Sequence, residues 1–115
     1  MKEHIMQLRP APLRKIKEGK KTIELRLYDE KRKDISIGDI IKFINTDDTD
    51  EVITVCVKNL YVFDSFAELY KKLPLLQCGY TEKDIDKASP TDMEQYYPKE
   101  KQRLYGVVGI EMELI

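Results

Sequence analysis

Residues 22–28 alternate between polar and aliphatic side chains and predict a strand with one fully polar face. In an extended chain, successive side chains point to opposite faces, so every second residue shares a side. Thr22, Glu24, Arg26 and Tyr28 therefore lie together on one side, opposite three aliphatic residues. This row combines a cation, an anion and two hydroxyls, which suits a site for a small polar ligand or a nucleotide.

Four more segments have the β-branched, aromatic or alternating residues that are typical of strands. They are residues 3–8, 40–44, 52–63 and 103–114. The longest of them is expected to bend or bulge near Asn59. Gly106 and Gly109, inside the last predicted strand, indicate a tight bend or a close approach of another segment.

Helix signals come before the polar strand. Pro10 and Pro12 are typical of the first turn of a helix, and Gly19 is typical of the position just after its end. We therefore expect a leading helix between them. The charged segment 29–34, which follows the polar strand, predicts a turn or a single helical turn.

A helical insertion is predicted before the final strand. Ser65 can cap a helix over residues 66–73. Thr81 and Thr91 resemble two further caps, because an acidic residue follows each of them three positions later. We expect a helix of about two turns after each threonine, and Pro98 should end the second.

Five strands without a regular strand–helix alternation argue against a doubly wound parallel sheet. The arrangement favours a mainly β or α+β fold with a mostly antiparallel sheet, a leading helix and a helical insertion before the last strand. Such a sheet hides its edges best by curling into a small barrel. The length of 115 residues predicts one domain over residues 1–115.

Composition narrows the classes of protein that fit. The chain is 42% hydrophobic and 36% charged, which is typical of a soluble globular protein. No apolar run approaches the ~20 residues that a membrane span needs, and the start of the chain has no signal-peptide pattern. Cys56 and Cys78 are expected to be reduced thiols in a cytoplasmic protein. With His4 as the single histidine, we expect no metal site, and nothing implies an organic cofactor.

The net charge of −1 conceals an uneven distribution of charge. Residues 1–33 hold 11 of the 20 Lys and Arg but only five of the 21 acids, so this part is strongly basic and the remainder is acidic. Because a local field matters more than the total charge, an anionic ligand is compatible with this chain.

The polar strand allows two interpretations. Side chains two residues apart on one face are roughly 6.5–7 Å apart, so Glu24 and Arg26 can form an ion pair. On a solvated strand this pair contributes little, whereas in a pocket it forms part of a ligand site. Lys21 lies in the turn before the strand and can point toward the same pocket.

The turn and the strand together contain a family motif. The spacing Gly19-x-Lys21-x-x-Glu24-x-Arg26 resembles the GxKxxExR signature of the ASCH domain (activating signal cointegrator homology), a branch of the PUA-like barrels. The surrounding sequence is also similar to this family over nearly the whole chain. The matching features are Leu13 and Ile16 before the motif, the Gly38-Asp39 turn and the closing segment 105–110.

The resemblance implies a barrel with a cleft beside the motif strand that binds RNA or a nucleotide. The residues implied in binding are Gly19, Lys20, Lys21, Thr22, Glu24 and Arg26. Lys21 and Arg26 would contact phosphate or carbonyl oxygens, and Glu24 would orient Arg26 or accept from a base. Arg14 and Lys17, with Lys20, would supply an outer, salt-sensitive field.

An enzymatic alternative comes from the same resemblance. Some small relatives are similar to N4-acetylcytidine amidohydrolases, with a lysine at the position of Lys21 and a threonine nucleophile at the position of Glu24. Lys21 and Glu24 are therefore the catalytic candidates for hydrolysis of a modified nucleoside. The later glutamate that this chemistry needs would be Glu82 or Glu94.

Other features favour structural roles. Tyr96 and Tyr97 can stack on a base, but aromatic residues next to a proline are more often part of the core. Ser65 and Ser89 are interpreted as helix caps. A third hypothesis is a protein-interaction domain whose charged strand is simply solvated; its protein partners stay open.

Overall fold

The computed structural model describes all 115 residues, and its five strands form one sheet in the order β1-β3-β4-β5-β2. The strands are β1 (Glu3–Leu8), β2 (Ile23–Leu27), β3 (Ile40–Asn45), β4 (Val52–Phe63) and β5 (Val107–Leu114). Only β1 and β3 pair in parallel, and the other three pairs are antiparallel. The predicted mostly antiparallel α+β fold is therefore confirmed.

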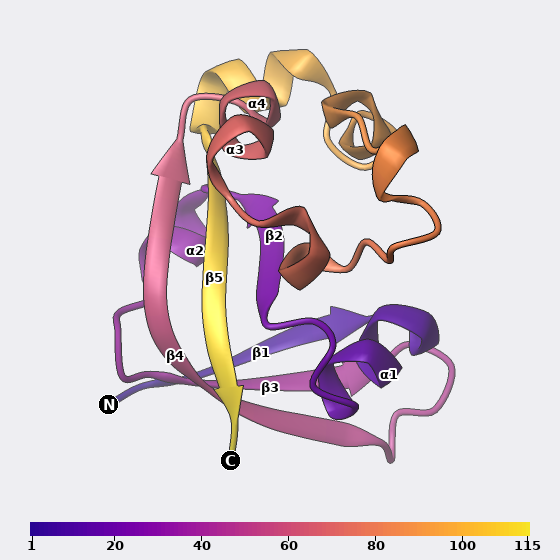
Figure 1. The fold of residues 1–115 in the computed structure, drawn as a ribbon. Coiled ribbons are helices and arrows are strands. Elements are labelled where there is room, and N and C mark those ends of the chain that lie inside the picture. The colour runs from indigo at the N-terminus through magenta and orange to yellow at the C-terminus, as the bar shows by residue number, and fades with distance from the viewer.

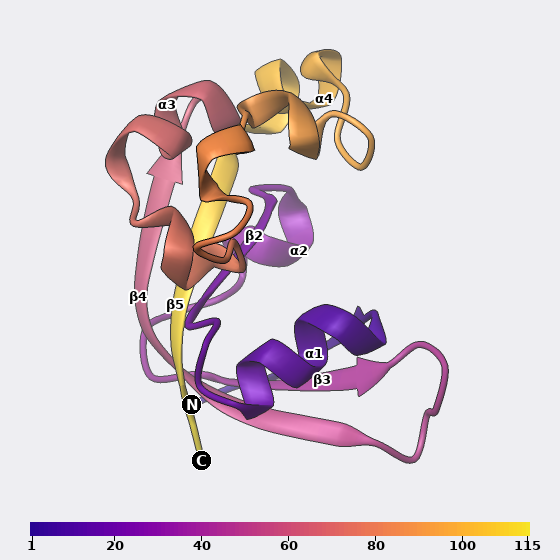
Figure 2. The same cartoon turned by 45° about the vertical axis from the view of Figure 1, so that its right-hand side comes forward.

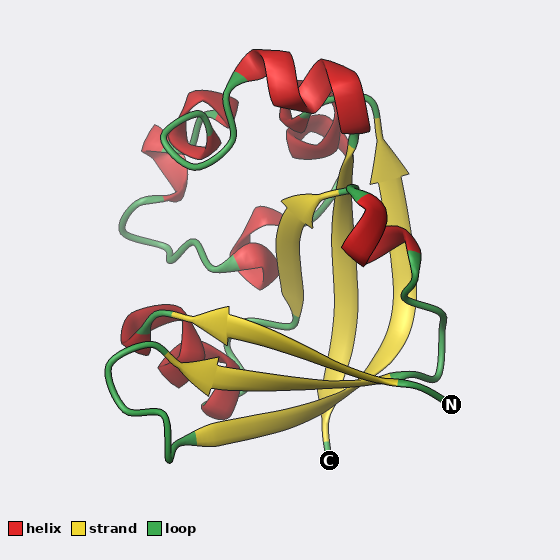
Figure 3. Cartoon of the chain, turned by 180° about the vertical axis from the view of Figure 1, so that it is seen from behind, coloured by secondary structure: helices red, strands yellow, loops and turns green.

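The sheet curls into a half-barrel because β4 is shared between two halves. Its first part pairs with β3, and its second part pairs with β5, with a register shift between Val57 and Asn59. The bulge predicted near Asn59 is thus confirmed. Figure 1 shows β2 and β5 upright beside the end of β4, while β1 and β3 cross beneath them; Figure 3 shows the same bend from behind.

Helices cover the two halves separately. The α-helices are α1 (Pro10–Lys17), α2 (Glu30–Lys33), α3 (Phe66–Lys72) and α4 (Lys99–Tyr105). The insertion also contains three short 3-10 helices, η1 (Leu75–Cys78), η2 (Ile85–Lys87) and η3 (Pro90–Met93). In Figure 2, α3 and the 3-10 helices gather over the upper part of β4 and β5, whereas α1 lies over the lower half. None of these helices has both the length and the apolar character that a membrane crossing demands.

The two helices predicted after Thr81 and Thr91 are wrong. The Asp84 carboxylate accepts hydrogen bonds from the Thr81 backbone and hydroxyl, which closes a local turn and leaves only a three-residue 3-10 helix behind it. Thr91 lies inside η3, whose cap is Ser89. Pro90 fixes a helical φ at the first position, so the capping box forms two residues earlier, between Ser89 and Asp92.

The predicted start of the last strand at Arg103 is also wrong. Pro98 begins α4 instead of ending a helix, and α4 runs to Tyr105. Gly106 then adopts a φ of +75° and terminates the helix, so β5 starts at Val107. Leu104, within the segment predicted as a strand, is a residue of α4 and is 73% exposed.

Apolar side chains form two cores, one on each face of β5. The barrel-side core has 12 buried residues, which come from β1, β3, β4, β5, α1 and the loop residue Ile35. The insertion-side core has seven, and the buried aliphatic residues of β2 belong to it. β5 contributes to both, which explains why its residues are buried in succession. A Cβ at position 109 would lie 2.6 Å from Leu73 Cδ1, so the close approach expected at Gly109 is confirmed.

Candidate functional site

A tight turn after α1 directs Lys21 into the molecule. Gly19 takes a φ of +78°, which favours glycine, and its N–H donates to Ile16 O. The N–H groups of Lys20 and Lys21 then both donate to Lys15 O. The chain therefore reverses beneath the helix, and Lys21 is buried immediately before β2 begins.

Lys21, Glu24 and Arg26 converge on one another. Lys21 Nζ lies 2.6 Å from Glu24 Oε1, and Arg26 Nε donates to Glu24 Oε2 at 2.7 Å. Glu24 is only 3% exposed. Arg26 Nη2 also donates to the Gln7 carbonyl oxygen at 2.9 Å, which links β2 to β1. The interpretation of this strand as a solvated surface is excluded by the burial of all three side chains.

The triad keeps its charges in a mostly dry environment. Burial raises the pKa of Glu24, but Lys21 and Arg26 together outweigh it and hold that pKa below its ordinary value. Burial lowers the pKa of Arg26, but Glu24, with smaller contributions from Tyr97 and Asp29, outweighs it, so that pKa is raised. Two cations around one anion leave a net positive charge. Buried ion pairs of this kind seldom add stability, so their presence points to function.

The triad forms one wall of a cavity of about 300 Å³. Besides these three residues, Leu25 of β2 lines it. The opposite rim comes from the end of β1 and the start of α1, including Gln7 and Arg9. Arg9 adds a further cation at the rim, so the cavity favours an anionic or carbonyl-rich ligand.

Met93, Tyr96 and Tyr97 of the insertion form the remaining wall. Tyr97 stacks on Phe66 with the ring centroids 5.8 Å apart, and Tyr96 is 55% exposed. Burial raises the pKa of Tyr97, so its hydroxyl stays protonated at neutral pH. Tyr97 is therefore both a packing residue and a cavity wall, whereas Tyr96 is not part of the core.

Gln102 of α4 holds this wall in place. Its Nε2 donates to Tyr97 O at 2.9 Å, and its Oε1 accepts from Phe66 N at 3.1 Å. Gln102 is buried, so its bond to Phe66 N is shielded from water, while the bond to Tyr97 O is partly buried.

Other residues of the sequence motif lie outside the cavity. Lys20 is exposed and sits 3.4 Å from Glu18. Thr22 Oγ1 donates to Gln77 Oε1 at 3.2 Å, and Gly19 faces open space. Lys17 is exposed and pairs with Glu51 at 3.7 Å, while Arg14 is an exposed residue of α1.

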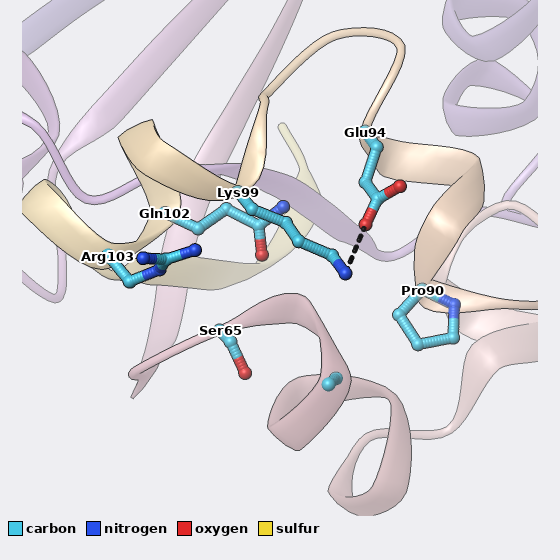
Figure 4. A pocket seen from close by; sticks show the side chains of 7 residues that line it. Ser65, Pro90, Glu94, Lys99, Gln102 and Arg103 are labelled. Atoms are coloured by element: carbon cyan, nitrogen blue, oxygen red, sulfur yellow. Dashed lines mark ion pairs between the residues drawn. The ribbon is translucent and has the colours of Figure 1, made fainter.

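Neither later glutamate faces the triad. Glu82 is exposed on the surface. Glu94 lines a different hollow, of about 170 Å³, between α3 and α4, where its carboxylate is 3.7 Å from Lys99 Nζ (Figure 4). Glu24 is therefore the only acid in the cavity beside the motif.

The thiols and the potential metal ligands are not arranged for chemistry. Cys56 and Cys78 are both free. Burial raises the pKa of Cys78 to about 11, so its thiol is inert at neutral pH even though Lys21 is near. No three His, Cys, Asp or Glu side chains lie close enough together to hold a metal ion.

Sequence reasoning missed the contributions of Gln7, Arg9 and Met93. Each is far from the motif in the chain, and only the curl of the sheet and the fold of the insertion bring it to the cavity. Arg9 lies directly after a predicted strand and before Pro10, but nothing in that position marks it as a rim residue.

Known proteins resemble this chain along its length. The sequence model of the ASCH domain matches residues 6–115. The crystal structure of the hypothetical protein PH0355 superposes with a TM-score of 0.80 at 37% identity, over all of both chains. The solution NMR structure of protein PF0455 from Pyrococcus furiosus gives 0.73 at 36% identity, over 100% of this chain and 98% of that one.

A more distant structure shows the same fold. The crystal structure of ASCH from Zymomonas mobilis has a TM-score of 0.67 at 15% identity, over 96% of this chain and 66% of that one. No protein with a curated functional description matches.

Proposed function

This chain belongs to the ASCH domain family, a PUA-like fold often proposed to bind RNA, and from that membership we propose that it binds a nucleotide, free or within RNA. The ligand would occupy the cavity beside residues 19–26. The observation that carries the proposal is the buried triad of Lys21, Glu24 and Arg26 facing a cavity with tyrosine walls.

Each wall has a role that nucleotide chemistry explains. Lys21 and Arg26 keep N–H groups free beyond their bonds to Glu24 and, for Arg26, to Gln7 O. These N–H groups would donate to phosphate or base carbonyl oxygens. Glu24 holds the side chains of both cations in a fixed orientation. Exposed Tyr96 offers a face for base stacking, which typically contributes ~1–3 kcal/mol per base. The volume of about 300 Å³ lies at the small end of ligand pockets and suits one nucleotide unit.

A small amidohydrolase acting on a nucleoside such as N4-acetylcytidine is the second candidate. The contact between buried Lys21 and Glu24 beside the cavity favours it, because acyl transfer can use such a pair. Two features count against it: no second acid lines the cavity, and Glu24 replaces the threonine nucleophile of the amidohydrolases. We therefore expect binding without turnover.

Neighbouring lysines give a matched test. Lys21→Met should weaken binding of nucleoside monophosphates and of a short single-stranded RNA by about tenfold or more, ~1.4 kcal/mol, because it removes a buried donor. Lys20→Met removes an exposed cation one residue away and should change affinity less than about twofold at ~0.15 M salt. Calorimetric titration measures both. Tyr96→Ala, at an exposed position that folding does not need, should weaken binding as well.

Equal effects of Lys20→Met and Lys21→Met would contradict the proposal, since they indicate a merely charged surface. The same samples, incubated with N4-acetylcytidine and followed by chromatography, test the second candidate. Release of cytidine that disappears in Lys21→Met would establish an enzyme.

A further inference from the structure

The cavity runs along the free edge of β2, not along one of its faces. β2 is the last strand of the sheet and pairs only with β5 (Figure 1). Glu24 and Arg26 point to the barrel side, because their partners Ile110 and Val108 belong to the barrel-side core. Leu25 points to the insertion-side core, yet it lines the same cavity. Met93 and Tyr97, which pack against the insertion-side core, line it as well, so the cavity extends from one face of β2 past its edge to the other.

The register of β2 and β5 identifies the backbone groups at that edge. Tyr28 N donates to Gly106 O at 3.0 Å, and Met112 N donates to Thr22 O at 2.9 Å. Even-numbered residues of β2 therefore form the hydrogen-bonded pairs with β5. In an antiparallel ladder the residues between them direct their N–H and C=O groups the other way. Leu25 is the odd-numbered residue of β2 that lines the cavity.

No strand covers this edge. β1 forms the other edge of the sheet, and the half-barrel stays open between β1 and β2. The hydrogen bond from Arg26 Nη2 to Gln7 O is the side-chain link across this seam. It occupies the Gln7 carbonyl. By the register of β2 and β5, the amide and carbonyl of Leu25 face this open edge, beside the cavity that Leu25 lines. Backbone groups at this depth normally have partners, so an open pair beside a cavity is a place for a ligand.

We propose that the N–H and C=O of Leu25 pair with the donor–acceptor edge of a nucleobase, which deepens and rests on the function proposed above. All four bases carry a donor next to an acceptor on the pairing edge, so one N–H and one C=O can hold any of them in the plane of the strand. The base then lies between the tyrosine wall and the triad. Lys21 and Arg26 reach its carbonyl or its phosphate.

The geometry favours a base over an added peptide strand. Strand addition extends over several residues of an edge. Here the bond between Arg26 and Gln7 blocks the seam beside Leu25, so only one residue of β2 is open within the cavity. A flat ligand with a single donor–acceptor pair fits this opening, and Tyr96 and Tyr97 give it a stacking surface.

Amide hydrogen exchange tests the free edge without a ligand. In the free protein, measured by NMR, the Leu25 amide should exchange faster than the amides of Glu24 and Arg26, although it lies between them. A saturating nucleoside monophosphate should slow the exchange of Leu25. Protection of Leu25 equal to that of its two neighbours in the free protein would overturn the inference.

Base analogues test the recognised edge. The nucleoside monophosphate that binds most tightly is compared with its blocked form, an analogue whose base is uncharged and carries methyl groups on the pairing edge. These forms are 3-methyluridine, 1-methylguanosine, N6,N6-dimethyladenosine and N4,N4-dimethylcytidine monophosphates. The blocked form should bind about tenfold more weakly or worse. For uridine, 5-methyluridine monophosphate carries the same methyl group away from the edge and should bind as uridine does.

Replacing one backbone amide by an ester tests the protein side. Leucic acid in place of Leu25 removes its N–H and should weaken binding about three- to tenfold. It also turns the Glu24 carbonyl, which pairs with β5, into a weaker ester acceptor, so a small loss of stability is expected. The same replacement at Leu27, also at the edge of β2 but outside the cavity, should leave affinity unchanged. Nucleotide binding that ignores both the blocked edge and the Leu25 ester overturns this inference alone. Failure of all nucleotides and RNA to bind overturns it together with the proposed function.

Discussion

Glu24 is the side chain on which the cavity depends. Its two oxygens accept from Lys21 and Arg26, so each cation is held in a fixed direction by the same carboxylate. Removing one partner of a buried charge pair is costly, because the charges left behind have lost their water and gain no new partner. Glu24 therefore stabilises the two cations that the proposed ligand would meet.

Glu24→Gln should lower the free energy of unfolding by about 3–5 kcal/mol at neutral pH. Glu18→Gln is the matched control. Glu18 pairs with exposed Lys20, and the loss there should stay below about 1 kcal/mol. Urea denaturation measures both. Similar small losses for the two variants would contradict the buried role of Glu24.

The stability difference between wild type and Glu24→Gln should depend on pH in one direction only. The pKa of Glu24 is lower in the folded protein than its ordinary value of 4.5. The stability that Glu24 contributes is therefore fully present above about pH 4.5 and is lost as pH falls through its folded pKa. The gap between wild type and Glu24→Gln should be constant from neutral pH down to that point and then close. Asp39, whose pKa the hydrogen bond from His4 also lowers, acts equally in both proteins and cancels.

Among the helices, α4 has the most direct effect on the site. Through Gln102 it holds the carbonyl of Tyr97 and the first N–H of α3, so it joins two parts of the insertion behind the tyrosine wall. The wall is thus set by contacts between elements and not by the loop that carries Tyr97.

Gln102→Leu should destabilise the protein by about 1–3 kcal/mol, because it leaves the buried Phe66 N–H and the partly buried Tyr97 carbonyl without partners. It should also weaken nucleotide binding, since Tyr97 loses its anchor. Gln95→Leu removes an exposed amide that donates to Asp92 O and should change neither property. Urea denaturation and calorimetric titration give the two values. Unchanged affinity in a destabilised Gln102→Leu would show that Tyr97 is held by its stacking on Phe66 alone.

Local signals predicted most elements, and tertiary contacts explain the failures. Pro10 and Gly19 bound α1 because their backbone preferences act within a single turn. The helix α4 was missed because its residues are almost all polar, so it shows no apolar face. In the site, Lys21, Glu24 and Arg26 share one short segment and could be found. Gln7 and Met93 could not, because the folded sheet alone brings them there.

Across the whole molecule, the cavity lies where two separately packed layers meet. Its triad belongs to the half-barrel, and its tyrosines belong to the insertion. The core on the insertion side is the smaller of the two, and residues 75–93 contain only the short 3-10 helices η1, η2 and η3. Segments with few buried apolar contacts open before the global unfolding of a protein. A ligand that touches both layers must oppose that opening.

Hydrogen exchange followed by mass spectrometry should therefore show faster exchange in residues 75–98 than in β3, β4 and β5. Saturating nucleotide should slow exchange in residues 75–98 and leave the sheet nearly unchanged, because the sheet is already protected. Slowing confined to residues 1–28 would place the ligand on the half-barrel alone and contradict contact with the tyrosines.

The seam between β1 and β2 allows the width of the opening between these two strands to change. Backbone hydrogen bonds hold all four neighbouring pairs of strands in the sheet at a fixed spacing. Between β1 and β2, by contrast, a single long side chain, Arg26, reaches across to Gln7. Its rotamers can follow small displacements of β1 while the apolar interior stays intact. Homologous domains can consequently evolve to bind ligands of different size by changing a few residues at the cavity rim, with little effect on folding.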